Sequence, residues 1–190
     1  MPSMSRIAAL AAMTLGAWGA TAARADTQVP QGPAQPAVWQ QHHAQFDYFG
    51  VATHYTCDSL ELKVRQILEY LGAKKGVYVV ATGCPRGPES LTRSAFVRVD
   101  FSTLVAAPEG GNAADIVPAV WTPTKLNAQK PMFMGDGDCE LIDHMRKLLT
   151  DNFSWKGTVT YQASCPVETV EMFDYHVQGD LLKASGAPAR

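Results

Sequence analysis

Two segments of the chain carry the same pattern of apolar and polar positions. The first begins at Cys57 and has apolar residues at the spacing of one helix face, namely Leu60, Val64, Ile67, Leu68 and Leu71. The second begins at Cys139 and repeats the pattern with Leu141, Met145, Leu148 and Leu149. Polar residues fill most of the positions between them. Each pattern predicts an amphipathic helix with one buried face.

Local signals predict where these helices begin and which elements come after them. Asp58 is expected to cap the first helix, with Glu61 as its capping-box partner, and Asp138 is expected to cap the second. A Lys-Gly pair follows each helix, at residues 75–76 and 156–157. Because β-branched and aromatic residues come next, both segments predict a strand after the turn.

The two segments also align with each other. After a one-residue gap behind the first cysteine, the positions match at an offset of 81 residues. The matched pairs include Leu60 with Leu141, Val64 with Met145, Arg65 with Arg146, Lys75-Gly76 with Lys156-Gly157, and Cys84-Pro85 with Cys165-Pro166. Agreement of the apolar positions, the turn glycine and the Cys-Pro pair predicts an internal duplication.

Further strands are predicted around the matched segments. The candidate strands are residues 46–56, 93–104, 117–126 and 168–181. The predicted fold class is therefore α+β, with two tandem β-α-β-β repeats at residues 46–106 and 117–182, joined by a linker at 107–116. They are expected to form one compact domain, either ferredoxin-like or a pseudo-symmetric sheet with two helices.

The two ends of the chain are expected to lie outside this fold. Arg6, an apolar run at residues 7–22 and the sequence Ala23-Arg24-Ala25 predict a signal peptide over residues 1–25, although an uncleaved anchor helix is the alternative. Residues 26–45, rich in Pro and Gln, are expected to form a flexible tail. Residues 183–190 are expected to be disordered.

Charge and hydropathy exclude two classes of partner. Loss of Arg6 and Arg24 would leave 14 basic and 18 acidic residues without a basic stripe, so no nucleic-acid partner is predicted. No second long apolar run exists, so no membrane span is expected after cleavage. The remaining partner classes are a protein or a small molecule in the cell envelope.

The four cysteines predict two disulfides. In each repeat one cysteine stands at the helix start and the other at the end of the following strand, so the two are expected to meet at one end of the unit. The predicted pairs are Cys57–Cys84 and Cys139–Cys165. Reactive thiols are the alternative, but the chain has no C-x-x-C motif.

A few side chains are candidate metal ligands. His42 and His43 are adjacent, and His54 precedes Cys57 by three residues. Met132 and Met134, with His144, contain the thioether and imidazole groups that suit copper. Each of these residues also has an ordinary interpretation as a solvated or core side chain. The alternating acids at 136–140 do not match an EF-hand loop.

Polar residues alternate along two predicted strands. Arg98 and Asp100 lie on one, and Asp174 and His176 lie on the other. They predict a solvent-exposed face of the sheet or, if their side chains converge, an enzyme site. Trp121 and Trp155 are candidates for an exposed aromatic patch or for core packing. The chain contains no G-x-S-x-G, H-E-x-x-H, P-loop or G-x-G-x-x-G motif, so no catalytic residue and no cofactor is predicted.

Residues 55–65 (YTCDSLELKVR) and Leu71-Gly72-Ala73 resemble a group of small exported proteobacterial proteins with no established activity. The resemblance implies a periplasmic or secreted setting. The leading functional hypothesis is an exported, disulfide-stabilised binding or interaction module. The alternatives are a periplasmic protein that handles copper or zinc, and an enzyme of unidentified class.

Overall fold

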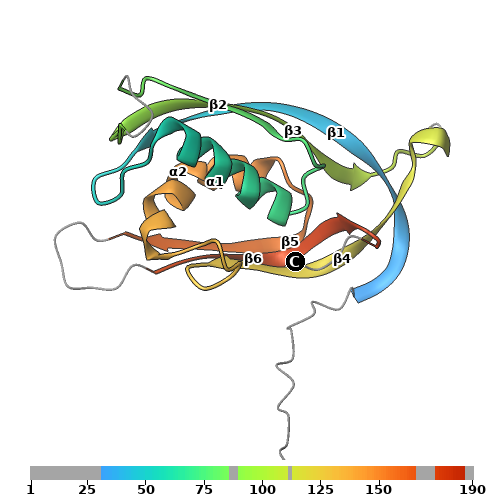
Figure 1. The fold of residues 1–190 in the computed structure, drawn as a ribbon. Coiled ribbons are helices and arrows are strands. Elements are labelled where there is room, and N and C mark those ends of the chain that lie inside the picture. The colour runs from blue at the N-terminus through green and yellow to red at the C-terminus, as the bar shows by residue number, and fades with distance from the viewer. Residues whose placement is uncertain (1–30, 86–89, 111–112, 166–173, 187–190) are drawn as a thin grey trace, which may run out of the picture.

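The computed structural model describes residues 31–85, 90–110, 113–165 and 174–186 (Figure 1). The elements in chain order are β1 (Gln31–Phe49), α1 (Cys57–Tyr70), β2 (Tyr78–Thr82), β3 (Ser94–Ala106), η1 (Ala113–Asp115), β4 (Val117–Asn127), η2 (Asp136–Asp138), α2 (Cys139–Asp151), β5 (Trp155–Ser164) and β6 (Asp174–Ala184). The predicted signal peptide and the first part of the predicted strand at 168–181 lie outside the described residues.

The strands form a six-stranded sheet that folds around the two helices. Their order is β2-β3-β1-β4-β6-β5, and neighbouring strands run antiparallel. The long strand β1 pairs with β3 on one side and with β4 on the other. Figure 1 shows β1 arching from one layer of the sheet to the other, with α1 and α2 between the layers. The predicted α+β class is confirmed.

Both helices bury the apolar faces that the sequence predicts. Leu60, Val64, Ile67 and Leu68 are buried on α1, and Leu141, Met145, Leu148 and Leu149 are buried on α2. They pack in one core against inward residues of the strands, among them Val97, Val99, Tyr175 and Val177. Burial of each large aliphatic side chain contributes about 1.5–3 kcal/mol, so this core is the main source of stability.

The hydrogen bonds at the starts of both helices differ from the prediction. Thr56, not Asp58, is the N-cap of α1, and its side chain accepts the Ser59 N–H at 3.1 Å. The Glu61 carboxylate accepts the backbone N–H of Ala81 at 2.8 Å instead of completing a capping box. Asp138 is the N-cap residue of α2, as predicted, but its side chain makes no cap hydrogen bond. The expected local bonds of Glu61 and Asp138 are replaced because both carboxylates find tertiary partners.

The prediction of a flexible tail at 26–45 is wrong from residue 31 onward. Those residues belong to β1, where His42 and Ala44 face the core side and His43 faces outward. Pro36 lacks an N–H, but its carbonyl accepts the Ala107 N–H at 3.0 Å. A strand forms despite the Pro and Gln content because β3 and β4, which are remote in sequence, supply pairing partners on both sides.

Two other predicted boundaries also shift. Residues 50–54 and 56 lie outside the strands, and Tyr55 makes only an isolated bridge to Thr92, so the predicted strand at 46–56 ends at Phe49. Lys183 and Ala184 belong to β6, where β4 pairs with them, and are not part of a disordered C-terminus. In the described part of the chain neither helix is long and apolar enough to cross a membrane.

Candidate functional site

Two disulfides tie the start of each helix to the end of the strand that follows it. Cys57 is bonded to Cys84 with the Cα atoms 6.0 Å apart, and Cys139 is bonded to Cys165 with the Cα atoms 5.7 Å apart. These are the pairs that the sequence predicts. Disulfides of this kind are typical of an oxidising, extracytoplasmic compartment.

The outer face of β1, β2 and β3 gathers polar and aromatic side chains into two rows. Strand register places Tyr78 opposite Asp100 and Asp100 opposite His43, which makes the first row. Gln41 lies opposite Ser102 in the next row. Because residues paired across an antiparallel ladder point to the same side of the sheet, these five side chains share one face.

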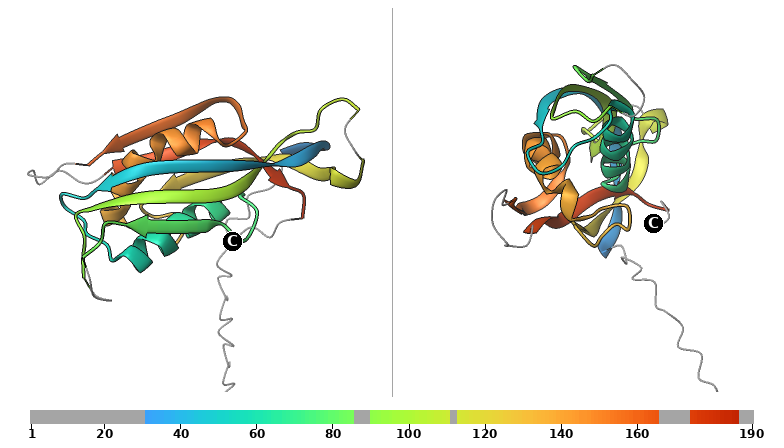
Figure 2. Two further views of the ribbon diagram at one scale, coloured as in Figure 1. Left: turned by 90° about the horizontal axis from the view of Figure 1, so that it is seen from above. Right: turned by 60° about the vertical axis from the view of Figure 1, so that its left-hand side comes forward.

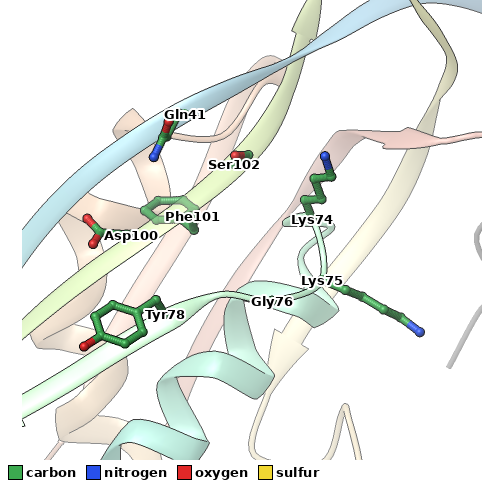
Figure 3. Close-up of a pocket in the computed structure, with 8 residues that line it drawn as sticks. All are labelled: Gln41, Lys74, Lys75, Gly76, Tyr78, Asp100, Phe101 and Ser102. Carbon is green, nitrogen blue, oxygen red and sulfur yellow. The ribbon is translucent and has the colours of Figure 1, made fainter. Parts of the chain in front are cut away.

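A shallow pocket of about 260 Å³ lies on this face, next to the start of β2 (Figure 3). Its lining residues are Gln41, Lys74, Lys75, Gly76, Tyr78, Asp100, Phe101 and Ser102. Figure 3 shows Tyr78 and Asp100 on one side of the hollow, the Lys74 side chain on the other, and the Lys75 side chain extending away. We call this the outer-face pocket.

Three contacts position Lys74 and Asp100, two charged residues of the outer-face pocket. The Lys74 N–H donates to the Ser102 carbonyl at 2.9 Å, and the Lys74 ammonium lies 5.9 Å from the centre of the Trp39 ring. The Asp100 carboxylate lies 2.6 Å from His43 Nδ1. The pocket therefore has a cation on one side and a carboxylate on the other, both accessible to solvent.

Tyr78 adds an apolar surface to the outer-face pocket. It is 60% exposed at the first residue of β2, although large aromatic rings in small domains are more often buried. Its neighbours Val79 and Ala81 alternate into the core, so the strand pattern itself directs Tyr78 outward. An exposed ring beside hydrogen-bonding side chains is suited to stacking against a flat, hydroxylated ligand.

The four residues of the predicted polar face do not come together. Arg98 and Asp100 lie on β3, whereas Asp174 and His176 lie on β6, and β1 and β4 separate these strands in the sheet. Asp174 accepts a hydrogen bond from Gln162 Nε2 at 3.0 Å. Of the four, only Asp100 lines the outer-face pocket. Asp100 belongs to a candidate site only because His43 of β1 and Tyr78 of β2 lie beside it, and the sequence pattern did not indicate these partners.

A second shallow pocket, of about 300 Å³, lies on the other half of the sheet. It is lined by Pro123, Thr124, Lys125, Lys156, Thr158, Gln178, Gly179 and Asp180. Like the outer-face pocket, it lies beside the start of the edge strand and combines lysine with aspartate. Its residues carry no exposed aromatic ring that corresponds to Tyr78.

The candidate metal ligands are dispersed. His42 Nε2 lies 2.7 Å from Thr103 Oγ1, and burial, followed by the charge of His43, lowers the His42 pKa. The sulfur of Cys57, near His54, is already in a disulfide. Met134 is buried and Met132 is exposed. Among the residues described by the structure, no group of three or more His, Cys, Asp or Glu side chains is arranged to hold a metal ion.

Neither candidate tryptophan forms an open aromatic patch. Trp121 is partly buried against a small second cluster that includes Ala37 and Leu104. Trp155 is partly buried against the main core, and its Nε1–H donates to the Leu149 carbonyl at 3.0 Å. Both tryptophans therefore take part in packing, and neither is available as an exposed patch.

A buried polar network lies between the two helix starts, and no pattern in the sequence predicts it. Asp138 accepts the Tyr55 hydroxyl at 2.5 Å, the Lys63 ammonium at 3.1 Å and the Gly135 N–H at 2.8 Å. Glu140 is also buried and accepts backbone N–H groups from the loop after β1. The alternating acids at 136–140 stand out in the sequence, but their spacing does not indicate the partners that these carboxylates bind.

The tyrosines around this network are held in their protonated form. Burial raises the pKa of Tyr55, and its hydrogen bond to Asp138 raises it further. Burial and the charges of Glu140 and Asp138 raise the pKa of Tyr48 in the same way. Since their hydroxyls donate to fixed acceptors, Asp138 and the Thr53 carbonyl, the two tyrosines join the loop after β1 to the start of α2.

Comparison with known protein families, curated proteins and solved structures finds no significant match for this chain.

Proposed function

We propose that this protein is an exported binding module and that the outer-face pocket binds a carboxylate-bearing sugar. The observation that carries the proposal is the row formed by Tyr78, Asp100 and His43, with the Lys74 ammonium beside it. Carbohydrate ligands need a flat apolar surface together with several hydrogen-bonding groups. An acidic sugar needs a cation in addition.

Five side chains of the pocket have a role in this proposal. The Tyr78 ring stacks against the apolar face of a sugar ring. Asp100 and Gln41 accept hydrogen bonds from hydroxyl groups, and Gln41 and Ser102 also donate to them. Lys74 pairs with the ligand carboxylate. Because the pocket is shallow and open to water, we expect a dissociation constant of roughly 0.1–1 mM for a single disaccharide.

The proposed setting is the periplasm or the extracellular space. Its support is the pair of disulfides, since such bonds persist in oxidising compartments. The N-terminal sequence has the features of a signal peptide, with cleavage proposed before Asp26. N-terminal sequencing of the exported protein tests the cleavage position.

We further propose that the chain arose by tandem duplication of a β-α-β-β unit. The support is the order of elements, in which β1-α1-β2-β3 is followed by β4-α2-β5-β6. The strands within each half are also ordered alike in the sheet, as β2-β3-β1 and as β5-β6-β4. The second pocket would then occupy the place equivalent to the outer-face pocket.

Titration calorimetry with a uronic-acid disaccharide and with its neutral hexose counterpart tests the binding proposal. The acidic sugar is expected to bind about tenfold more tightly than the neutral one, and Lys74→Met is expected to remove that difference. Tyr78→Ala is expected to weaken binding of both sugars because both stack on the ring.

Lys147→Met is the matched control, because Lys147 is an exposed lysine on α2, away from the pocket. It is expected to leave both titrations unchanged. Absence of binding at about 10 mM of either sugar would overturn the proposal. Equal affinity for the two sugars would show that the pocket has no preference for a carboxylate-bearing sugar.

A further inference from the structure

The two edges of the sheet are closed to different degrees. β2 forms one edge and has five residues, whereas β5 forms the other and has ten. An edge strand presents unpaired backbone N–H and C=O groups, which can pair with another strand. Proteins that stay monomeric usually cover such an edge or place charges along it.

Side chains from α1 cover the edge at β2. The Glu61 carboxylate accepts the Ala81 N–H at 2.8 Å, and Arg65 Nε donates to the Val77 carbonyl at 3.2 Å. These bonds occupy one backbone group just before β2 and one near its end. A strand that approached this edge would have to displace two charged side chains.

The matched positions of α2 do not cover the edge at β5. The residue that corresponds to Glu61 is Ile142, which is fully buried and has no carboxylate to offer. Arg146, which corresponds to Arg65, places its guanidinium over the Tyr161 ring at 4.8 Å. In the described part of the chain, the edge of β5 thus lacks the side-chain bonds that close the edge of β2.

We propose that β5 pairs with β5 of a second copy of this chain, so that two sheets join edge to edge in a dimer. The strand carries a suitable set of side chains for self-pairing. Residues 157–164 contain no charged residue, so like charges would not face each other across the contact. Figure 2, in its left view, shows β5 along the outer margin of the molecule.

The half-exposed apolar residues of β5 favour a second copy. Val159, Tyr161 and Ala163 point toward the core but are only partly buried, because the sheet stops at this strand. An antiparallel β5 from another copy would continue the sheet and extend the same apolar face. Antiparallel pairing is the arrangement of every neighbouring pair in this sheet, and it has the two-fold symmetry of a homodimer.

The register of the contact follows from the length of the uncharged stretch. A two-fold axis close to Tyr161 would place Thr160 opposite Gln162 and Thr158 opposite Ser164 of the other copy. Gly157 has a φ of +75°, and the pairing with β6 shifts between Lys156 and Thr160, so the flat part of β5 begins after this bulge. Lys156 would therefore lie at the end of the contact.

Sedimentation equilibrium of the oxidised full chain tests the proposal. The protein is expected to dimerise with a dissociation constant in roughly the micromolar range. The double variant Thr160→Lys and Gln162→Lys is expected to be monomeric, because it places ammonium groups of the two copies opposite each other. The matched control at the other edge, Val80→Lys and Thr82→Lys, is expected to dimerise like the unmodified chain.

Hydrogen exchange of the unmodified chain at low and high concentration gives a readout that does not depend on a variant folding. Dimerisation is expected to slow exchange of amides in residues 158–164 and to leave those of β2 unchanged. A monomer at about 500 µM would overturn the proposal. It would equally be overturned if the β5 variant dimerised, or if protection rose at another surface and not in β5.

Discussion

The carboxylate of Glu140 accepts the backbone N–H of Val51 at 3.0 Å, although 89 residues separate the two in sequence. The N–H groups of Ala52 and Thr53 point to the same carboxylate, at 3.1 Å and 3.0 Å. Three consecutive amides thus enclose one buried acid. This contact joins the first turn of α2 to the loop between β1 and α1, and so connects the two halves of the chain.

We expect Glu140→Ala to lower the free energy of unfolding by about 2–3 kcal/mol, because it leaves three amides without their charged acceptor. Glu140→Gln keeps an acceptor without the charge and is expected to lose less. Urea denaturation measures both effects. Glu109→Ala, at an exposed position, is the control and should change little. Equal stability of the Glu140→Ala variant and the unmodified chain would mean that the amides find other partners.

Gly50 is predicted to be intolerant of any side chain. A Cβ there would lie 1.9 Å from the Thr53 carbonyl oxygen and 2.3 Å from the Tyr48 hydroxyl. Because backbone must move to relieve such contacts, we expect Gly50→Ala to cost more than about 3 kcal/mol or to prevent folding.

Gly76→Ala is the comparison for this substitution. Gly76 has a φ of +93°, but a Cβ there would meet nothing within 4 Å. Only the left-handed backbone conformation is penalised, at about 1–2 kcal/mol. The melting temperature of Gly50→Ala should be well below that of Gly76→Ala. The opposite order would contradict the close contacts of Gly50 with Thr53 and Tyr48.

Lys183 is predicted to make stability rise with pH in the alkaline range. Its ammonium donates to the Tyr70 carbonyl at 3.0 Å, at the end of α1, and burial lowers its pKa from 10.5 to about 8. Between pH 8 and pH 10 the unfolded chain therefore holds this proton more tightly than the folded chain does. Stability should increase over this range as the buried amine becomes neutral.

Above about pH 10 the buried tyrosines should reverse the trend. Burial raises the pKa of Tyr48 and Tyr175 in the folded protein, so the unfolded chain loses these protons first and stability falls. Lys183→Met should remove the rise between pH 8 and pH 10 while it leaves the fall above pH 10. Chemical denaturation at a series of pH values measures both the rise and the fall in the free energy of unfolding. An unchanged rise in the variant would contradict the assignment to Lys183.

The two disulfides are predicted to contribute similar stability. They close loops with sequence separations of 27 and 26 residues, for which loop entropy implies about 3–4 kcal/mol each. Replacement of either pair by serine should lower the free energy of unfolding by that amount. Urea denaturation of the two double variants measures the difference. A much larger loss for one pair would show that its contribution includes native packing at that helix start.

The sequence was sufficient for features that depend on local spacing. The apolar stripes of α1 and α2 follow from the period of the helix, because the same spacing that defines one face also defines which side chains are buried. The pairing of Cys57 with Cys84 follows from the reversal of direction between a helix and the next strand. Both arguments use only residues that are near each other in the chain.

Tertiary structure decided the features that depend on strands remote in sequence. Residues 31–45 have the composition of a tail and become a strand only because β3 and β4 pair with them. Asp138 has the position of a helix cap, yet Tyr55 and Lys63 bind its carboxylate. The outer-face pocket depends on the register that sets Tyr78, Asp100 and His43 side by side. His43 lies on β1, which α1 and β2 separate from β3 in the chain, and no local pattern encodes the register between such strands.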